Sequence, residues 1–575
     1  MTERKVGIAV ALTCITAVAL VLRVIGLRFG LPAVYNPDEI AIVARALTFA
    51  KGTLNPQNFV YPTFFFYVLF GWLAVYLGIV WASGRVASIA QLQQLYFSNP
   101  SGIYTAARSL GAVSGTATVL LLYRLTAQFA DVRAGLAASA FLAVAPLHVR
   151  DSHYVKHDVP ATLTIVVAYL AMTRVWPRPP SSGRPRTRDA LIAAAACGVA
   201  FSTHYYCVFL AFPLLWVVVQ GWRAAGWRAV LRHVCLAAIV SGIVFFLLSP
   251  FLLLEPATAW RDVVANRRIV VDRAVESGAF APARRYIDVL VTDALGVPVL
   301  LLAAAGTVWT IATQPRVAVF LLAFPASFFL FIVNTFPASR YLNPILPFAA
   351  LFAGWFLSKA AAAVRAPSWA VAMAVIAAAL PGAVASVKTD LFFRQDDTRT
   401  IARRSLEMMI PPGASVLIQP QSVPLTPSRE ALLEALQRNL GSAEAASVKF
   451  QLQLAQHPYP SPSYRLVYLG KGMDAEKIYV DYSELGGIRE LDALQQLRLN
   501  YVVVKRYNRP DPGTLPFLAA LARGGRRIAT FSPFRPGVPE VEQARIEPFL
   551  HNTDSRIDAA LERPGPVVEI WQLDR

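Results

Sequence analysis

Charge and cysteine are both scarce in this sequence. Charged residues make up 15% of the 575 residues, whereas hydrophobic residues make up 56%. A chain of this length with so few charges cannot be one compact water-soluble domain. The four cysteines all lie in apolar runs, and no two of them have C-x-x-C spacing: Cys14, Cys197, Cys207 and Cys235. This pattern excludes a disulfide framework and a cysteine-built metal site.

Other familiar signals are missing too. The net charge of +19 could suit nucleic acid. However, the arginines fall mostly in short gaps between apolar runs, which is typical of membrane loops, so we expect no nucleic-acid partner. The first apolar run, 6–26, is long for a signal peptide, and no small-x-small cleavage site follows it. We therefore expect an uncleaved first span. The excess of arginine over lysine hints at a bacterial source.

The sequence is rich in apolar runs of about 20 residues, the length that crosses a hydrocarbon layer. These runs lie near 6–26, 62–81, 103–123, 134–149, 158–173, 190–202, 204–220, 233–251, 294–312, 317–334, 341–358 and 367–387. They predict a multi-span α-helical membrane domain over 1–387, with about 11–12 spans. After Lys388 the sequence changes to charges, prolines and short alternating runs, which predict a soluble α/β domain over 388–575.

The run 62–81 decides the topology. Lys and Arg concentrate in the cytoplasmic loops of membrane proteins. If 62–81 does not cross, most loop cations fall inside, and the C-terminal domain lies outside. If it crosses, every later loop changes side and the bias is lost. We therefore predict 11 crossings and an interfacial or re-entrant helix at 62–81, within a first outer loop of 27–102. Its aromatic start, Tyr61-Pro-Thr-Phe-Phe-Phe-Tyr67, suits headgroup depth.

The C-terminal domain has the pattern of alternating strands and helices. Strands are predicted at 415–419, 464–469, 501–505, 527–531 and 567–572, and helices at 399–409, 428–440, 488–497 and 516–522. It has neither a glycine-rich phosphate loop nor a Ser/His/Asp set at motif spacing. We expect a packing or acceptor-docking role for it.

Asp38 and Glu39 form the first candidate site, because they follow the first span closely. Paired acids at a membrane surface can deprotonate a hydroxyl or hold a divalent ion. The alternative is a helix start near Pro37 with two acids in its first turn.

The loop 150–158, with the sequence RDSHYVKHD, is the second candidate. Its charges lie close to hydrocarbon, where they are costly and commonly functional. Asp158 opens the next span and could equally be a helix start. His153 and His157 are four apart, so they could share a helix face as metal ligands.

Two further candidates lie at predicted outer boundaries. Arg340 opens a span, and its guanidinium suits a phosphate, although it could also be a snorkelling interfacial arginine. His204 lies at another outer boundary and could face the same cavity.

Taken together, these segments resemble the GT-C membrane glycosyltransferases, in particular glycosyltransferase family 39 with its protein O-mannosyltransferases. The resemblance covers roughly 6–420. It rests on GLPAVYNPDE (30–39), NPQNFVYP (55–62), APLHVRDSHYVKHD (145–158), SRYLNPILP (339–347), DTRTIA (397–402) and PPGASV (411–416).

The resemblance implies catalytic roles for Asp38, with Glu39 beside it, and for Asp158. It implies that Arg340 contacts the donor phosphate, and we add Lys156, His204 and Tyr61 as candidate phosphate contacts. His204 stands where many bacterial relatives have lysine, and His153 where an arginine is common. The cofactor stays open: a divalent metal could be held by Asp38, Asp158 or His157.

The expected function is transfer of a sugar from a polyprenyl-phosphate donor to a lipid, glycan or protein hydroxyl. The expected place is the extracytoplasmic face of the plasma membrane. A polytopic transporter or lipid flippase is the alternative; a sensor or assembly scaffold is a third.

Overall fold

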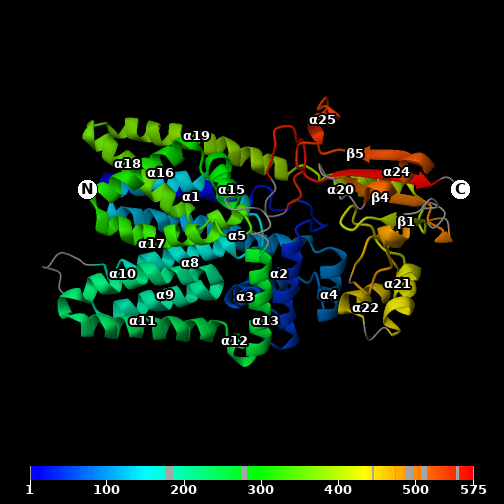
Figure 1. Cartoon of the computed structure of the whole chain (residues 1–575), viewed down its shortest axis with the longest axis horizontal. Coiled ribbons are helices and arrows are strands. Elements are labelled where there is room, and N and C mark those ends of the chain that lie inside the picture. Colours follow the sequence, from blue (N-terminus) through cyan, green and yellow to red (C-terminus); the bar gives the residue numbers. More distant parts are fainter. Residues whose placement is uncertain are drawn as a thin grey trace. The chain divides into compact units, whose positions relative to one another are not determined.

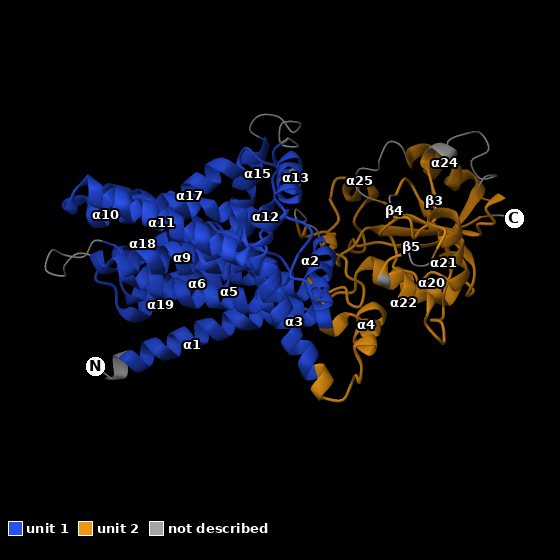
Figure 2. Cartoon of the chain, turned by 90° about the horizontal axis from the view of Figure 1, so that it is seen from below, with its two compact units in different colours: residues 1–27, 38–79, 103–391 blue, residues 28–37, 80–102, 392–575 orange. Residues whose placement is uncertain are grey.

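The computed structural model describes residues 2–176, 185–272, 281–442, 446–472, 474–485, 494, 496–506, 514–551 and 556–573. The chain forms two compact units, coloured in Figure 2. Unit 1 comprises 1–27, 38–79 and 103–391, and unit 2 comprises 28–37, 80–102 and 392–575. The predicted boundary at 388 is close to the structural one. The sequence did not predict that 28–37 and 80–102 belong to the C-terminal unit.

Unit 1 is a bundle of helices that share one general direction (Figure 1). Each apolar run of the sequence is helical in the structure, because a segment surrounded by hydrocarbon must satisfy its backbone hydrogen bonds internally. The bundle helices are α1 (Thr2–Val24), α5 (Ser101–Phe129), α6 (Val132–Ala143), α8 (Asp158–Met172), α9 (Thr187–Thr203), α10 (Ala211–Trp222), α11 (Trp227–Leu248), α16 (Val297–Thr313), α17 (Pro315–Ile332), α18 (Leu346–Ala363) and α19 (Ser368–Phe393).

Small residues let these helices pack closely. A Cβ on Gly354 of α18 would lie 2.6 Å from the carbonyl oxygen of Ala134 in α6. A Cβ on Gly198 of α9 would lie 2.7 Å from the carbonyl oxygen of Ser241 in α11. Such contacts replace the hydrophobic driving force that lipid cannot supply.

Eight helices of the described residues are long and apolar enough to cross a membrane, or nine if the bent pair Ala281–Ala294 and Val297–Thr313 is one span. That set includes Phe64–Ala82 and leaves out α6, α8 and α9, which have 12, 15 and 17 residues. The sequence-based prediction of eleven crossings differs from this set. It includes the three shorter helices as spans and leaves out 62–81.

Three helices run across the bundle direction: α2 (Pro37–Thr48) and α13 (Pro256–Arg267) in Figure 1, and α3 (Phe64–Ala82) in Figure 2. An interfacial helix would have this orientation. The orientation of α3 therefore favours the interfacial helix predicted at 62–81, which stays a prediction. Short helices complete the unit: η1 (Phe49–Lys51), α7 (Pro146–Asp151), η3 (Tyr205–Leu210), η4 (Arg223–Ala225), α12 (Phe251–Leu254), η5 (Arg268–Asp272), α15 (Ala281–Val289), η6 (Leu290–Ala294) and η7 (Ser339–Leu342).

Unit 2 contains a six-stranded sheet of order β3-β2-β1-β4-β6-β5. The first four strands in this order are parallel, and β6 pairs antiparallel with β4 and β5. The elements are α4 (Ile89–Ser98), α20 (Thr398–Met409), β1 (Ser415–Ile418), α21 (Arg429–Ala435), η8 (Leu436–Leu440), α22 (Val448–Leu454), β2 (Arg465–Leu469), β3 (Tyr479–Val480), η10 (Tyr482–Leu485), β4 (Tyr501–Arg506), α24 (Leu515–Gly524), β5 (Gly525–Phe531), α25 (Glu540–Gln543) and β6 (Val567–Leu573).

The predicted α/β class of this unit is confirmed, with all five expected strands present. The predicted helices at 399–409, 428–440 and 516–522 are also present, whereas 488–497 lies mostly outside the described residues. Sequence reasoning missed β3 and α22. Both faces of the sheet are buried, which explains the continuous apolar runs of the parallel strands. Leu417 packs on the face toward α24, and Val416 on the face toward α20.

Candidate active site

Asp38 lies in the first turn of α2, in unit 1. Pro37 begins the helix, where its missing N–H costs nothing. The carboxylate of Asp38 is 3.1 Å from Lys156 Nζ and 3.7 Å from Arg340 Nη1, and its side chain is 43% exposed. The predicted helix start near Pro37 is therefore confirmed. Asp38 is more than a first-turn acid, however, because it also contacts two cations from distant segments.

Asp158 is the first residue of α8 and is buried. Its Oδ2 lies 3.6 Å from Arg340 Nε, so a single guanidinium reaches both predicted acids. Three segments that are far apart in the sequence thus bring two carboxylates and two cations together, as predicted for one shared site. Their formal charges cancel.

The cations control the ionisation of Asp38. Burial acts to raise the pKa of Asp38, but Lys156 and Arg340 outweigh it and hold the pKa below its ordinary value of 3.8. Burial, together with Arg340, lowers the pKa of Lys156, although Asp38 opposes this. Asp38 is therefore ionised at neutral pH.

Aromatic rings lie beside the charged group. The ring of Tyr61 stacks on His157 at 4.1 Å and meets His204 edge-on at 5.3 Å. His204 in turn stacks on Tyr206 at 3.7 Å. Burial, helped by Arg45 and Arg340, lowers the pKa of His157 to about 3, so this ring is neutral at pH 7. These stacked rings form an aromatic wall that includes His157, the residue before Asp158.

Several polar atoms of this region are buried without a hydrogen-bond partner in the described part of the chain. They include His157 Nε2, Asp158 Oδ1 and Tyr206 Oη. Buried polar atoms are nearly always paired in folded proteins, so exceptions of this kind are explained best by a ligand or ordered water.

Glu39 has a different environment from its neighbour Asp38. Its side chain is fully buried and accepts two hydrogen bonds from Arg108 of α5, at 3.0 and 2.8 Å. It also accepts the backbone N–H of Val155 at 3.0 Å. These contacts hold α2 against α5 and the loop 150–158. They favour a positioning role for Glu39 over the catalytic one predicted.

A second set of contacts joins the loop 150–158 to the Arg340 turn. Arg150 donates to Ser339 Oγ at 2.8 Å, and Asn343 donates to Asp151 Oδ2 at 2.6 Å. Sequence reasoning missed Asn343 and Arg108 altogether. The only signal for Arg108 is a charge inside a predicted span, which is itself a functional indication.

The proposed helix face shared by His153 and His157 is wrong. α7 ends at Asp151 and α8 begins at Asp158, so neither histidine lies within a helix. His153 instead contacts the carbonyl oxygens of Val149 and Ile25, at 2.9 and 2.7 Å. Within the described ranges, no three His, Cys, Asp or Glu side chains are grouped to hold a metal ion, and Asp38 and Asp158 face cations instead.

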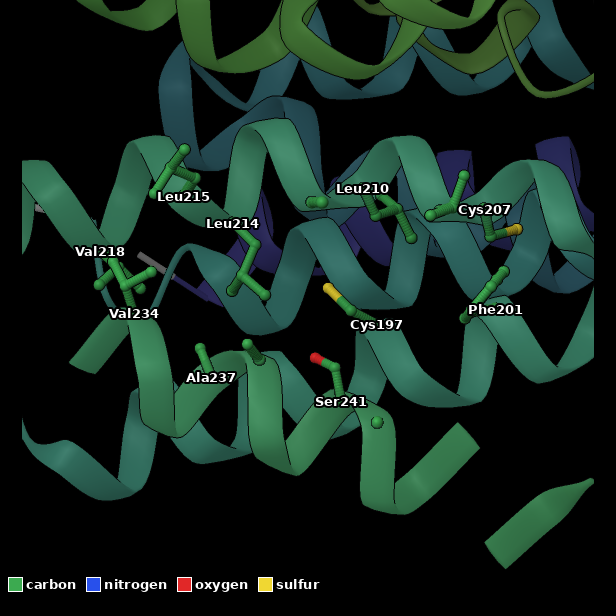
Figure 3. A pocket seen from close by; sticks show the side chains of 14 residues that line it. Cys197, Phe201, Cys207, Leu210, Leu214, Leu215, Val218, Val234, Ala237 and Ser241 are labelled. Atoms are coloured by element: carbon green, nitrogen blue, oxygen red, sulfur yellow. The ribbon is translucent and has the colours of Figure 1, made fainter. Parts of the chain in front are cut away.

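An apolar pocket of about 420 Å³ lies between α9, α10 and α11 (Figure 3). Phe201 and Cys207 line one end of it, and Val218 and Val234 line the other. Phe201 and Cys207 flank His204 in the sequence, and Cys207 donates its N–H to the His204 carbonyl at 3.0 Å. The pocket therefore begins beside the aromatic wall. It follows the chain from Cys207 in η3 to Val218 in α10.

Residues 97–253 match the family model described as dolichyl-phosphate-mannose-protein mannosyltransferase. No curated protein sequence matches the chain. Among solved structures, the archaeal oligosaccharyltransferase AglB from Archaeoglobus fulgidus, in complex with an inhibitory peptide and a dolichol-phosphate, is similar at 12% identity. The match covers 99% of this chain and 89% of that one, with a TM-score of 0.52.

ArnT from Cupriavidus metallidurans, bound to undecaprenyl phosphate, is similar at 14% identity over 97% of both chains, with a TM-score of 0.49. At 12% identity the likeness to AglB shows the fold. The family match and this shared fold confirm the predicted resemblance: the chain has the GT-C fold of the membrane glycosyltransferases.

Proposed function

We propose that this protein transfers a sugar from a polyprenyl-phosphate donor to an acceptor hydroxyl at the extracytoplasmic face of a membrane. The observation that carries the proposal is the meeting of Asp38, Asp158, Lys156 and Arg340 within 3.1 to 3.7 Å. An ionised carboxylate can accept a hydroxyl proton, and two cations can stabilise a departing phosphate. The neighbouring His157 Nε2 and Asp158 Oδ1, buried without a hydrogen-bond partner among the described residues, could bind a polar ligand.

The reaction would be a single displacement at the anomeric carbon. Asp38 accepts the proton of the acceptor hydroxyl while the hydroxyl oxygen forms a bond to the anomeric carbon. The bond from the anomeric carbon to the phosphate oxygen breaks, and the phosphate keeps the electron pair. Lys156 and Arg340 then stabilise the phosphate charge, the guanidinium by its fork of N–H donors. One displacement inverts the anomeric configuration.

Several other residues would support this chemistry without reacting. Tyr61, His157 and His204 form an uncharged wall next to the phosphate cations, so His204 contributes shape rather than a positive charge. Glu39 would hold α2 through Arg108. Asp158 would keep Arg340 oriented. Should a divalent ion take part, Asp38 and Asp158 are the carboxylates that would hold it, displacing the cations.

The apolar pocket suits the hydrocarbon tail of the donor. Its wall is almost wholly apolar side chains of α9, α10 and α11, and it begins beside His204 (Figure 3). A tail lying there would place its phosphate near the aromatic wall, because a prenyl chain and its headgroup are continuous.

The outer face is supported by charge and by orientation. Loop cations concentrate on the opposite side if 62–81 does not cross. In Figure 2, α3 runs across the direction of the bundle helices, as an interfacial helix would. A bacterial cell envelope would be the setting.

A transporter or flippase is the second candidate function, and it is disfavoured. The charged residues of the site lie at the ends of helices and in the turns between them rather than at the middle of spans, where transport sites lie. The family match over 97–253 also favours sugar transfer.

The test is the variant Asp38→Asn, which keeps the shape and removes the base. Transfer should be abolished, and the lipid-linked sugar should accumulate to the level found in a gene-deletion strain, measured by mass spectrometry of extracted lipids. Asp288→Asn is the matched control, because this acid lies in α15 of the same unit with a half-exposed side chain. Full activity of Asp38→Asn, with normal lipid levels, would show the assignment to be wrong.

A further inference from the structure

Arg45 is a cation near the candidate active site that the proposed mechanism does not use. It lies in the last turn of α2, and its guanidinium carbon is 5.5 Å from the centre of the Phe66 ring. The acid whose charge stabilises Arg45 is Asp262. The two oxygens of Asp262 have other partners, the N–H of Phe59 and the guanidinium of Arg261, both at 2.9 Å. In the described part of the chain, Arg45 therefore carries a charge that no ion pair neutralises.

Arg45 and Asp38 lie on the same face of α2. They are seven residues apart in one helix, and seven helical steps of about 100° come within about 20° of two full turns. At a rise of about 1.5 Å per residue, they are separated by about 10.5 Å along the helix axis. The helix thus presents the proposed base near its start and an unpaired cation near its end, in one line.

A single displacement places the leaving phosphate at a definite distance from the base. The base lies about 3 Å from the hydroxyl oxygen whose proton it accepts, and that oxygen approaches the anomeric carbon to about 3 Å. The phosphorus is two covalent bonds further on, so in-line attack puts it about 9 Å from the base. This distance is close to the spacing of Asp38 and Arg45 along α2. Because Lys156 and Arg340 lie beside the base itself, the far side of the phosphate is left for another cation.

The aromatic wall connects Arg45 to the apolar pocket. The Phe66 ring next to Arg45 meets the His157 ring edge-on at 5.0 Å. Tyr61 stacks on the same His157 ring and meets His204, beside which the pocket begins. The charge of Arg45 helps to lower the pKa of His157, and the buried Nε2 of this ring has no hydrogen-bond partner among the described residues. A donor whose tail lies in the pocket would therefore carry its phosphate toward an unpaired cation and an unpartnered ring nitrogen.

We propose that Arg45, together with His157 Nε2, binds the phosphate of the lipid-linked donor on the side away from Asp38. This inference rests on the proposed function and deepens it, because it identifies the residue that recognises the charge of the donor. The formal charges of the two acids and two cations around Asp38 cancel, so Arg45 gives the site a net positive charge that complements an anionic phosphodiester. A guanidinium can donate two parallel N–H bonds to phosphate oxygens, and the neutral imidazole can add one more.

The test measures the binding of two lipids, undecaprenyl phosphate and the uncharged undecaprenol, to the purified full-length protein. Arg45→Met removes the charge but keeps a side chain that can cover Phe66. It should weaken the binding of undecaprenyl phosphate by about 10- to 100-fold, because hydrogen bonds to charged groups are strong, and leave undecaprenol binding unchanged. Arg45→Lys keeps the charge without the fork of donors and should recover part of the loss. In the transfer assay, the donor KM of Arg45→Met should rise by a similar factor, with the acceptor KM unchanged.

Arg267→Met is the matched control, since Arg267 is an exposed arginine in the last turn of α13; its affinities and KM values should be those of the parent. Binding of undecaprenol shows that each variant is folded. Parental affinity for undecaprenyl phosphate and a parental donor KM in Arg45→Met, with Asp38→Asn inactive, would overturn this inference and leave the proposed function intact. Equal losses for both lipids in both Arg45 variants would also overturn it, because they would assign Arg45 to the shape of the tail site rather than to the phosphate.

Discussion

An ion pair of unit 2 and the charged cluster at Asp38 in unit 1 differ in how their arginines are paired. In unit 2, Arg465 takes both oxygens of Glu434 at 2.8 Å, with both side chains about a quarter exposed. In the candidate active site of unit 1, Arg340 lies 3.7 Å from Asp38 and 3.6 Å from Asp158. In the close bidentate pair, the arginine donates hydrogen bonds to both carboxylate oxygens. An arginine shared between two carboxylates at longer distances loses less when it binds a phosphate instead. This difference in geometry distinguishes ion pairs that stabilise the fold from charged side chains that are available for binding and catalysis.

The strongest test of this comparison is Arg340→Ala. Removal of a group that stabilises developing charge typically costs about 10²- to 10³-fold in rate. We expect kcat to fall by that amount in a steady-state assay. Arg340→Lys should recover only part of it, because a lysine keeps the charge but lacks the fork. A rate within twofold of the parent in Arg340→Ala would remove Arg340 from the mechanism.

Glu39→Gln tests the stabilising kind of charge inside unit 1. It leaves Arg108 buried without its counter-charge, and such a loss costs about 3–5 kcal/mol. Thermal unfolding in detergent should show a clearly lowered Tm. The double variant Glu39→Met with Arg108→Met should regain much of it. If Glu39→Gln unfolds like the parent but is inactive, Glu39 acts in catalysis as the sequence predicted.

Lys156→Met should have an intermediate effect that depends on pH. Asp38 has a lowered pKa because Lys156 and Arg340 outweigh burial, so the parent loses activity only as pH falls through that low value. Without Lys156, burial is opposed less and the pKa of Asp38 rises. The acidic limb of kcat/KM should therefore move to higher pH. A shift to lower pH would contradict the geometry.

Arg465→Met in unit 2 should have the smallest effect. Its pair with Glu434 is partly exposed, and pairs of this kind contribute about 0–1 kcal/mol. We expect parental kinetics and a Tm within a few degrees of the parent. A loss of activity here would mean that charge in unit 2 also serves the reaction.

The contrast between neighbours shows where sequence reasoning stops. Asp38 and Glu39 are both acids in the first turn of one helix, and the sequence assigned them one role. They point to different surroundings because successive helical residues are about 100° apart. Glu39 meets Arg108, a residue of α5 that carries no motif, and Asp38 meets Lys156 and Arg340. Which face of α2 is buried depends on its neighbours in space.

By itself, the sequence predicted the membrane bundle, the α/β class of the C-terminal unit and the meeting of Asp38, Asp158, Lys156 and Arg340 in space. Hydrophobic runs and strand alternation are local properties, so they can be read along the chain. Only the tertiary structure decided that Glu39 is paired, that His153 and His157 share no helix face, and that 28–37 packs with a unit more than 350 residues away in sequence. These depend on contacts between distant segments, for which the linear order carries no signal.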